Sequence, residues 1–347
     1  MYTQFDDARL QKLKEAKLHM LRYEALRTYM ASPKQNLFHS SQSPIRALVG
    51  SNKSGKSYAG TAELLNIVGG VHQYRKNYIG AVNGRDCCVD FDTLDQVLIP
   101  IYQSMAPRNE CKLDGLTFEG HPRIWPGLKG GDWEKAYDKQ HRMLYFANGS
   151  KIEFKSYVED PESFAGPVCH AIRMDEEPPE FVFNENMARQ MTTAVNIMFT
   201  LTPLNYSQWL YHTLVDGHLS GTCFTVKMTY RDNPYINKEV VEMMEQTITD
   251  PAERAARLEG EFTYVTGRVW KQYGQHNLIP YRPIPCEWPR AITIDPHEEK
   301  PTAVQWTAED FESNMYVYRE LLLAADVEEI CKQIRSSSVG ENIEVIL

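Results

Sequence analysis

Residues 46–65, RALVGSNKSGKSYAGTAELL, place glycine, lysine and serine at a spacing that can bind phosphate. Gly50, Gly55, Lys56 and Ser57 fit the pattern G-x-x-x-x-G-K-[ST]. In that pattern the loop N–H groups and the helix start face a β-phosphate, the lysine reaches the β- and γ-oxygens, and the hydroxyl ligates Mg²⁺. The sequence therefore predicts a nucleotide-binding loop made of Gly50, Ser51, Asn52, Lys53, Ser54, Gly55, Lys56 and Ser57.

Two adjacent acids, Asp175 and Glu176, follow an apolar run in the segment AIRMDEE. Ligands of open α/β sheets bind at the carboxyl ends of the strands, which is where these acids should lie. In an ATPase the aspartate would hold the Mg²⁺ shell and the glutamate would polarise the attacking water. Adjacent acids after a strand are more often a solvated turn, but a phosphate loop more than a hundred residues upstream favours catalysis. Glu177 stays open as an alternative to Glu176.

A third signal is the segment FTLTPLNYSQW, which puts Thr200 and Thr202 at the end of a strand before a proline turn. Hydroxyls at this position could sense the γ-phosphate and pass its loss to neighbouring elements. The simpler interpretation is a threonine-rich strand end, and only the other two motifs favour a role in nucleotide binding.

The elements that must position these residues can be predicted from hydrophobic patterns. Apolar residues at helical spacing predict a helical lead-in over 7–31, which the segment 31–44 ends. Asn148-Gly149 between two alternating runs predicts a hairpin over 143–157. Strands alternating with helical stretches favour a largely parallel, doubly wound α/β core. Besides the strand at 47–49 and the helix at 57–65, we expect a helix at 90–105 and strands within 77–84, 168–180, 195–205 and 222–230.

Composition narrows the class of protein. The chain has 347 residues, enough for two domains, with 42% hydrophobic and 24% charged residues, as is usual for soluble proteins. No apolar run approaches a membrane span and the N-terminus is unlike a signal peptide, so we expect an intracellular protein. Seven scattered cysteines predict reduced, mostly buried thiols. A net charge of −9 means that any nucleic-acid contact must come from a local patch.

With these motifs in order, the chain resembles the large terminase subunit, the DNA-packaging ATPase and nuclease of tailed bacteriophages. The resemblance is carried by FHSSQSPIRALVGSNKSGKSYAG, FANGSKIEFKSY, DPESFAGPVCHAIRMDEEPP, TLTPLN, YRDNPYINKE, ARLEGEFTYVTGRVWKQY and AITIDPHEEKPTAVQWTA. It implies that Lys56 and Ser57 are Walker A residues and that Asp175 and Glu176 are the Walker B aspartate and the catalytic carboxylate. It also implies that Thr200 to Thr202 is the coupling motif.

The resemblance implies an α/β fold, with a mostly parallel P-loop NTPase core of the RecA/ASCE type followed by the start of an RNase H-like nuclease. The domains would be a helical lead-in at 1–34, the ATPase at 35–250, a linker at 251–285 and the nuclease start at 286–347. ATP and Mg²⁺ would be the cofactors, with Mg²⁺ or Mn²⁺ for the nuclease. Implied partners are double-stranded DNA, the portal protein, the small terminase subunit and further copies in a ring, in the cytoplasm of the infected bacterium.

One departure concerns the phosphate loop itself. Many relatives carry an arginine there, whereas this chain has Asn52 and Lys53. Lys53 can supply the charge, but lysine lacks the planar fork of arginine. An arginine from a neighbouring subunit is the alternative.

The tail, residues 289–320, predicts three strands, the first ending in Asp295 and the third in Glu320. By resemblance, Asp295 matches the first acid of a cluster that holds two metal ions for phosphodiester cleavage. Glu320 is the weaker candidate, because an acid after an edge strand is more often only solvated. The chain ends in ENIEVIL, an apolar strand, where relatives supply the next acid, so we expect an incomplete nuclease.

Two other classes of protein share part of this pattern. A helicase-like or other P-loop translocase would carry further helicase motifs and a second RecA-like lobe, whereas residues 260–347 look like a nuclease start. A nucleotide-gated scaffold would lack a catalytic glutamate, and Glu176 argues against it. The lysines and arginines within 121–142 are candidates for gripping DNA, with a solvated loop as the alternative.

Overall fold

The computed structural model describes residues 7–75, 78, 80–118, 121–166, 168–191, 193–204, 207–248, 251–262, 277–280, 282–296 and 301–347. The chain divides into two compact units, residues 1–269 and residues 270–347, each with its own core. Within the described ranges, no helix is long and apolar enough to cross a membrane.

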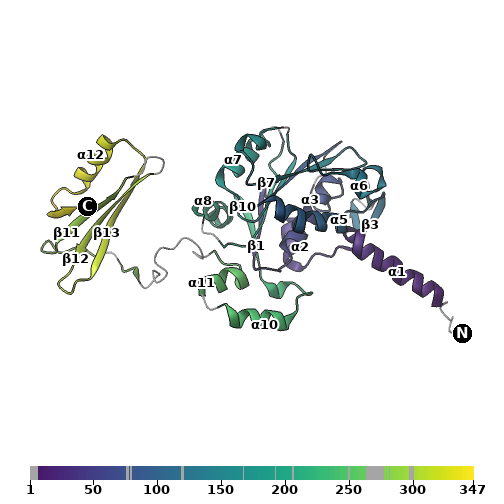
Figure 1. The fold of residues 1–347 in the computed structure, drawn as a ribbon, viewed down its shortest axis with the longest axis horizontal. Coiled ribbons are helices and arrows are strands. Elements are labelled where there is room, and N and C mark those ends of the chain that lie inside the picture. Colours follow the sequence, from purple (N-terminus) through teal and green to yellow (C-terminus); the bar gives the residue numbers. More distant parts are fainter. Residues whose placement is uncertain are drawn as a thin grey trace. The chain divides into compact units, whose positions relative to one another are not determined.

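An eight-stranded sheet forms the centre of the first unit, in the order β10-β1-β9-β8-β2-β7-β6-β5 (Figure 1). The first six of these strands are parallel, and β6 and β5 extend the sheet in antiparallel fashion. The strand β9 lies between the phosphate-loop strand β1 and the strand β8 that ends in Asp175. The strands are β1 Ile45–Gly50, β2 Asn83–Cys88, β5 Tyr137–Asp138, β6 Met143–Tyr145, β7 Lys151–Ser156, β8 Ala171–Asp175, β9 Ile197–Leu201 and β10 Cys223–Met228.

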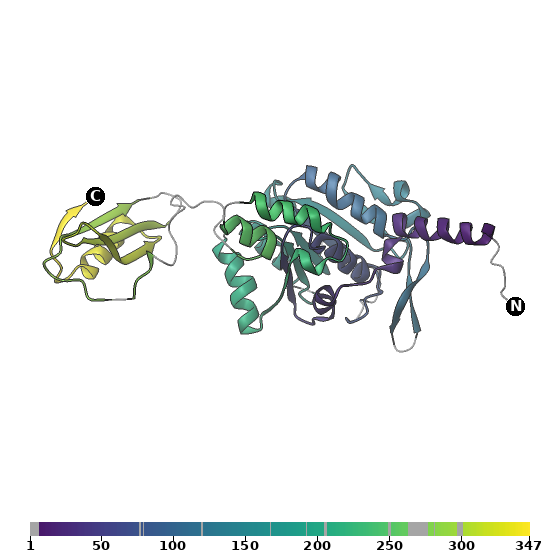
Figure 2. The ribbon, with the colours of Figure 1, turned by 90° about the horizontal axis from the view of Figure 1, so that it is seen from below.

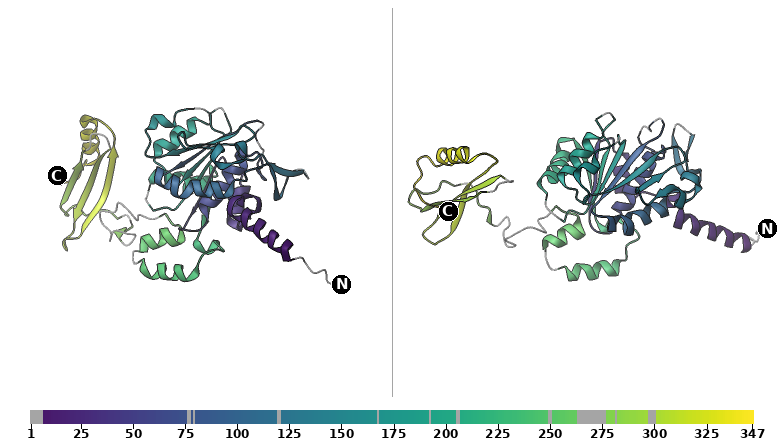
Figure 3. Two further views of the ribbon diagram at one scale, coloured as in Figure 1. Left: turned by 45° about the vertical axis from the view of Figure 1, so that its right-hand side comes forward. Right: turned by 45° about the horizontal axis from the view of Figure 1, so that its top comes forward.

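Helices cover both faces of this sheet, as Figure 3 shows. One buried cluster joins α3 and α5 to one face, and a second joins α7 and the segment from α8 to η5 to the other. The predicted doubly wound α/β fold is therefore confirmed. The helical elements of the sheet layers are α2 Pro33–Ser40, α3 Lys56–Val68, α4 Phe91–Thr93, η2 Leu94–Leu98, α5 Ile99–Met105, η3 Lys129–Gly131, α6 Trp133–Ala136, η4 Pro161–Phe164, α7 Glu180–Ala188, α8 Gln208–Tyr211, η5 His212–Asp216 and α9 Gly217–Ser220.

The lead-in is helical, as expected, but it is not one helix. The helix α1 spans Asp7–Tyr23 and η1 spans Ala25–Thr28, with Glu24 between them in a non-helical conformation. The segment 31–44, expected only to end the helix, contains α2. Its start is a capping box, because Ser32 accepts from the Gln35 N–H while the Gln35 side chain accepts from the Ser32 N–H. The proline at the first helical position completes a start signal that hydrophobic spacing does not show.

Two further differences concern strands. The second strand is β2 at Asn83–Cys88 rather than within 77–84, of which residues 77 and 79 lie outside the described residues. Arg85 and Asp86 are fully buried in it, and their charges hide the strand from a hydrophobic pattern. A hairpin that was not predicted, β3 Cys111–Phe118 with β4 His121–Trp125, projects from the unit in Figure 2. The hairpin predicted around Asn148-Gly149 is confirmed by the antiparallel pair of β6 and β7.

The end of the first unit is helical: η6 Tyr230–Asp232, α10 Lys238–Thr247, α11 Pro251–Arg254 and η7 Ala255–Glu259. The second unit is a four-stranded sheet in the order β13-β12-β11-β14, with α12 Val327–Ser337 packed on one face. The three predicted strands are present as β11 Arg290–Asp295, β12 Thr302–Glu309 and β13 Met315–Leu323, and β14 Ile343–Ile346 pairs parallel to β11. The start of an RNase H-like domain expected in this part of the chain stays a prediction.

Candidate nucleotide site

The predicted site residues of the first unit meet at the carboxyl ends of three adjacent parallel strands. Leu48 of β1 pairs with Thr200 of β9, and Thr200 pairs with Asp175 of β8. Because these strands run in the same direction, their ends place the phosphate loop, Thr202 and Glu176 at one edge of the sheet. The loop begins where β1 ends and closes on Gly55, whose φ of 94° precedes the first turn of α3. Lys53 also has a positive φ, 59°, so the chain turns sharply around this loop.

Lys56 lies at the centre of the edge and is 5% exposed. Its ammonium donates to the Ser51 carbonyl at 2.7 Å and to the Thr202 hydroxyl at 3.0 Å. Burial lowers the pKa of Lys56, and the nearby Glu176 and Asp175 carboxylates oppose this effect. The lysine is thus held over the loop by the loop itself and by the end of β9.

Glu176 directly follows β8 and has a φ of 61°, in the left-handed region. A residue other than glycine or asparagine is uncommon there, and such conformations cluster at functional sites. The turn aims its side chain at the end of β9, where Glu176 Oε2 accepts from the Thr202 N–H at 2.8 Å. Burial and the adjacent Asp175 raise the pKa of Glu176 to about 7, although Lys56 acts in the opposite sense. A carboxylate with a raised pKa is suited to accept a proton.

Asp175 is 3% exposed and takes part in a dense hydrogen-bond network. Its Oδ1 accepts from the Ser57 hydroxyl at 3.3 Å and from the Thr200 hydroxyl at 2.6 Å, and it also pairs with Arg173. Hydroxyl and carboxylate oxygens are ligands that Mg²⁺ prefers. The structure therefore brings Ser57 and Asp175, the two predicted metal ligands of this unit, into contact.

Several residues that sequence reasoning missed hold the phosphate loop. The Gln35 amide donates to the Gly55 carbonyl at 3.1 Å, and the Asn233 amide donates to the Lys53 carbonyl at 2.6 Å. The Asn52 N–H donates to the Arg257 carbonyl at 2.9 Å. Their signals in the sequence are the capping box around Gln35 and the segments YRDNPYINKE and ARLEGEF, two of the segments that carry the resemblance.

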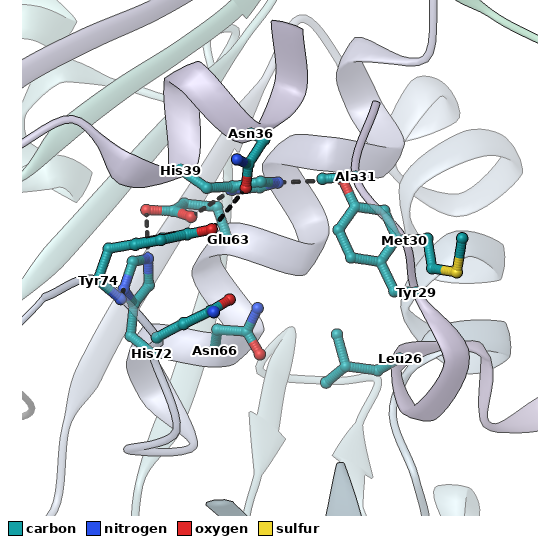
Figure 4. Close-up of a pocket in the computed structure, with 11 residues that line it drawn as sticks. Leu26, Tyr29, Met30, Ala31, Asn36, His39, Glu63, Asn66, His72 and Tyr74 are labelled. Carbon is teal, nitrogen blue, oxygen red and sulfur yellow. Dashed lines mark hydrogen bonds and ion pairs between the residues drawn. The ribbon is translucent and has the colours of Figure 1, made fainter. Parts of the chain in front are cut away.

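A buried acid that sequence reasoning also missed lies on the third turn of α3. Glu63 is fully buried and pairs with Arg46, with His39 at 2.6 Å and with His72 at 2.9 Å. Burial alone would raise the pKa of Glu63, but His72, Arg46 and two histidine hydrogen bonds hold it well below the usual range. Figure 4 shows Glu63, His39 and His72 beside a cavity of about 350 Å³, which Tyr29 borders on the opposite side. The Tyr29 hydroxyl lies 3.0 Å from His39 Nε2, so a hydrogen-bonded chain reaches the cavity wall.

The predicted nuclease residues belong to the second unit. Asp295 ends β11 as predicted, but Glu320 does not end its strand, because β13 continues to Leu323. Both residues are exposed. The strand β12 separates them, with Asp295 opposite Ala303 and Glu320 opposite Gln305. Neighbouring strands are about 4.8 Å apart, so the two backbones are separated by about 10 Å across the sheet. Among the described residues there is no group of three or more histidine, cysteine or acidic side chains placed to hold a metal ion.

The basic residues within 121–142 fall into two groups. Arg123 is buried, and the Arg142 guanidinium lies 3.5 Å from the centre of the Phe91 ring, so both are part of the fold. Lys129, Lys135 and Lys139 are exposed. Only the second group has the solvent access that a contact with DNA needs.

Comparison with known proteins supports the resemblance seen in the sequence. Residues 133–273 match the family model described as "Terminase large subunit, T4likevirus-type, N-terminal". The large terminase of the thermophilic bacteriophage D6E has a similar fold, with a TM-score of 0.50 and 14% identity, over 92% of this chain and 76% of that one. A structure of that terminase in complex with ATP-γ-S gives a TM-score of 0.51 and 14% identity, over 91% of this chain and 76% of that one. Among curated proteins, none matches the sequence.

The family model and the solved structures cover different parts of the chain and support different conclusions. The family model covers only the later part of the first unit, up to the beginning of the second. The solved structures extend over almost the whole chain but, at such low identity, they establish the fold alone. Together with the geometry of the strand edge, they confirm that the chain resembles the large terminase subunit of tailed bacteriophages.

Proposed function

We propose that this chain is the ATP-driven motor of viral DNA packaging, which moves double-stranded DNA into a procapsid. The observation that carries this proposal is the shared strand edge, where Thr202 contacts Lys56 and Glu176 and where Ser57 contacts Asp175. The match to the terminase family model supports the choice of substrate. Such a motor would work in the cytoplasm of the infected bacterium.

The residues at this edge fit Mg-ATP. When bound, Mg-ATP supplies the γ-phosphoryl group and neutralises part of its charge. Lys56 would face the β- and γ-phosphates, and Ser57 and Asp175 would hold the metal shell. Glu176 would orient the attacking water and accept its proton, a task for which its raised pKa is suited. We assign this role to Glu176 rather than to the adjacent Glu177 because the Glu176 carboxylate bonds to Thr202 at the end of β9.

Thr200 and Thr202 would couple hydrolysis to movement. Thr202 donates its N–H to Glu176 and its hydroxyl accepts from Lys56, so one residue touches both the base and the phosphate-binding lysine. Thr200, in β9 and two residues before Thr202, donates to Asp175. A change at the γ-phosphate would therefore reach β9 directly. Lys53, or an arginine from a neighbouring copy in a ring, would supply the remaining positive charge.

The second unit would cut concatemeric DNA with Mg²⁺ or Mn²⁺. This part of the proposal depends on Asp295, because Glu320 lies two strands away. Lys129, Lys135 and Lys139 are the exposed cations of the 121–142 segment that would contact DNA. The portal protein and the small terminase subunit would be the protein partners.

A packaging assay tests the proposed function. Procapsids bearing their portal, the small terminase subunit, linear double-stranded DNA and ATP are mixed with the chain, and DNA protected from added nuclease is measured. We expect ATP-dependent protection by the wild-type chain and none by Lys56→Ala. Unwinding of a forked duplex without any DNA protection would instead identify a helicase-like enzyme and contradict the proposal.

A further inference from the structure

An arginine to which the sequence motifs assign no role lies fully buried beneath the proposed metal site. Arg173 is on β8, two residues before Asp175, so both side chains leave the strand on the same face. Its guanidinium pairs with Asp175 and, at 3.1 Å, with Asp86 of β2. It also donates to the Thr61 hydroxyl at 2.9 Å and to the Thr200 hydroxyl at 3.1 Å. One side chain thus connects β8 to β2, β9 and α3.

The helix facing this arginine is built to accommodate it. A Cβ at Gly60 of α3 would lie 2.6 Å from Arg173 Nε and 2.7 Å from Thr200 Cγ2. Glycine inside a helix costs about 1 kcal/mol relative to alanine, so propensity gives no reason for it here. The close approach of the Arg173 guanidinium explains the glycine, because only a residue without a side chain leaves room for the guanidinium.

The hydrogen bonds that Asp175 accepts converge on one of its two carboxylate oxygens. Arg173, Thr200 and Ser57 all bond to Oδ1, and Oδ2 accepts no hydrogen bond from any described residue. The Thr200 hydroxyl accepts from Arg173 Nε and donates to Asp175, so the arginine also orients the threonine. Three donors on one oxygen fix the rotation of the carboxylate and leave the other oxygen for a ligand.

We propose that Arg173 is a positioning residue that orients Asp175 toward the metal shell and ties it to Thr200 of β9. The inference rests on the proposed function, since it assigns Asp175 to Mg²⁺. Removing a partner that orients a metal ligand typically lowers metal affinity or activity by 10–100-fold. Arg173→Met should therefore raise the Mg²⁺ requirement while nucleotide binding without metal, which depends on the loop and Lys56, is retained.

Arg85 provides a matched control. It is also fully buried, on the adjacent strand β2, but it faces the other side of the sheet and pairs with Glu153 at 2.8 Å. Among the described residues its hydrogen bonds run to Glu153, the Phe164 carbonyl and Asn186, and none reaches Asp175, Thr200 or the phosphate loop. Arg85→Met removes a buried charge of the same kind, so it reproduces a general loss of stability without touching the proposed metal ligand.

The experiment measures the Mg²⁺ concentration that gives half of the maximal ATP turnover. A second readout is the Mg²⁺ concentration that gives half of the thermal stabilisation by ADP. For Arg173→Met we expect both midpoints to rise about tenfold or more, and Arg173→Lys, which keeps the charge but not the fork, to fall between it and the wild type. Binding of a fluorescent ADP analogue in EDTA should stay within about twofold, and Arg85→Met should leave the midpoints unchanged.

Unchanged midpoints in Arg173→Met, or an equal shift in Arg85→Met, would overturn the positioning role. If Arg173→Met does not fold, Arg173→Lys and Gly60→Ala decide in its place, since the added methyl group must displace the guanidinium. If the wild-type chain binds Mg-ADP but shows no ATP turnover, the proposed function fails while the ADP midpoints still test the role of Arg173.

Discussion

At the residue scale, each side chain of the nucleotide site has contacts that suit a separate task. Lys56 is held by oxygen acceptors of the loop and of Thr202, and Asp175 by donors that converge on one oxygen. Glu176 differs, because within the described part of the chain its carboxylate accepts only from the backbone N–H of Thr202. Its carboxylate therefore keeps an oxygen that can accept a proton from water.

Glu176→Gln should separate binding from chemistry. An amide cannot accept the proton that the attacking water loses, so ATP turnover should fall by roughly a hundredfold or more. Binding of Mg-ATP, measured with a fluorescent analogue, should stay near the wild-type value. Glu177→Gln is the matched control and should retain most of the turnover. If the large loss occurs in Glu177→Gln and not in Glu176→Gln, the base must be assigned to the neighbouring residue.

The sequence predicted those site residues that belong to motifs, because nucleotide binding requires a fixed spacing between them. Lys56, Ser57 and Asp175 follow from motifs, and the structure brings them together. Arg173, Asp86 and Glu63 could not be predicted, because a charged residue in a strand or helix is normally an exposed one. Their partners lie up to 112 residues away, as with Arg173 and Thr61, and no local pattern shows such a pairing.

At the element scale, the Glu63 cluster joins four segments of the first unit. Its members come from β1, α2, α3 and the turn after α3. Glu63→Gln would leave the buried Arg46 without its charge partner, and breaking a buried pair in this way costs about 3–5 kcal/mol. Guanidinium unfolding of the first unit should show this loss, whereas the exposed Glu134→Gln should change little. A loss below about 1 kcal/mol would contradict the structural role of the cluster.

A second element-scale prediction concerns Gly260, at the end of η7. Its φ is 65°, and a Cβ there would lie 2.4 Å from the Gly50 Cα in the phosphate loop. The methyl group added by Gly260→Ala should displace the phosphate loop and weaken nucleotide binding, measured by titration with a fluorescent ADP analogue. Gly221→Ala is the matched control, because its φ is 81° and its Cβ would meet nothing within 4 Å. Equal affinities in the two variants would show that η7 does not support the loop.

Helices and strands were predicted well where their residues show a clear hydrophobic pattern. The strands β1, β8 and β9 are mostly apolar and buried, the edge strand β10 is partly buried, and the sequence placed all four. The strand β2 was misplaced because buried ion pairs, rather than apolar side chains, satisfy Arg85 and Asp86. The helix α2 was not predicted because its start is marked by capping residues rather than by hydrophobic spacing, and because it has only eight residues.

At the scale of the whole molecule, two units with separate cores would carry two activities. Asp295→Ala should leave ATP turnover within about twofold of the wild type, because Asp295 lies in the unit without the phosphate loop. The 1–347 chain itself should cut plasmid DNA little with Mg²⁺ or Mn²⁺, since two-metal cleavage needs several converging acids. Metal-dependent nicking that survives Asp295→Ala would show that the nuclease site lies elsewhere.

The most direct test of the central claim is Mg²⁺-dependent ATP hydrolysis by the wild-type chain and by Lys56→Ala, with the circular dichroism spectrum of each recorded in parallel. The exposed Lys139→Ala serves as the matched control. We expect turnover by the wild type and by Lys139→Ala, and a fall to background in Lys56→Ala with an unchanged spectrum, because the cation facing the β- and γ-phosphates is lost while the backbone loop stays. Near-normal hydrolysis by a folded Lys56→Ala would contradict the assignment of this strand edge as the motor's ATP site.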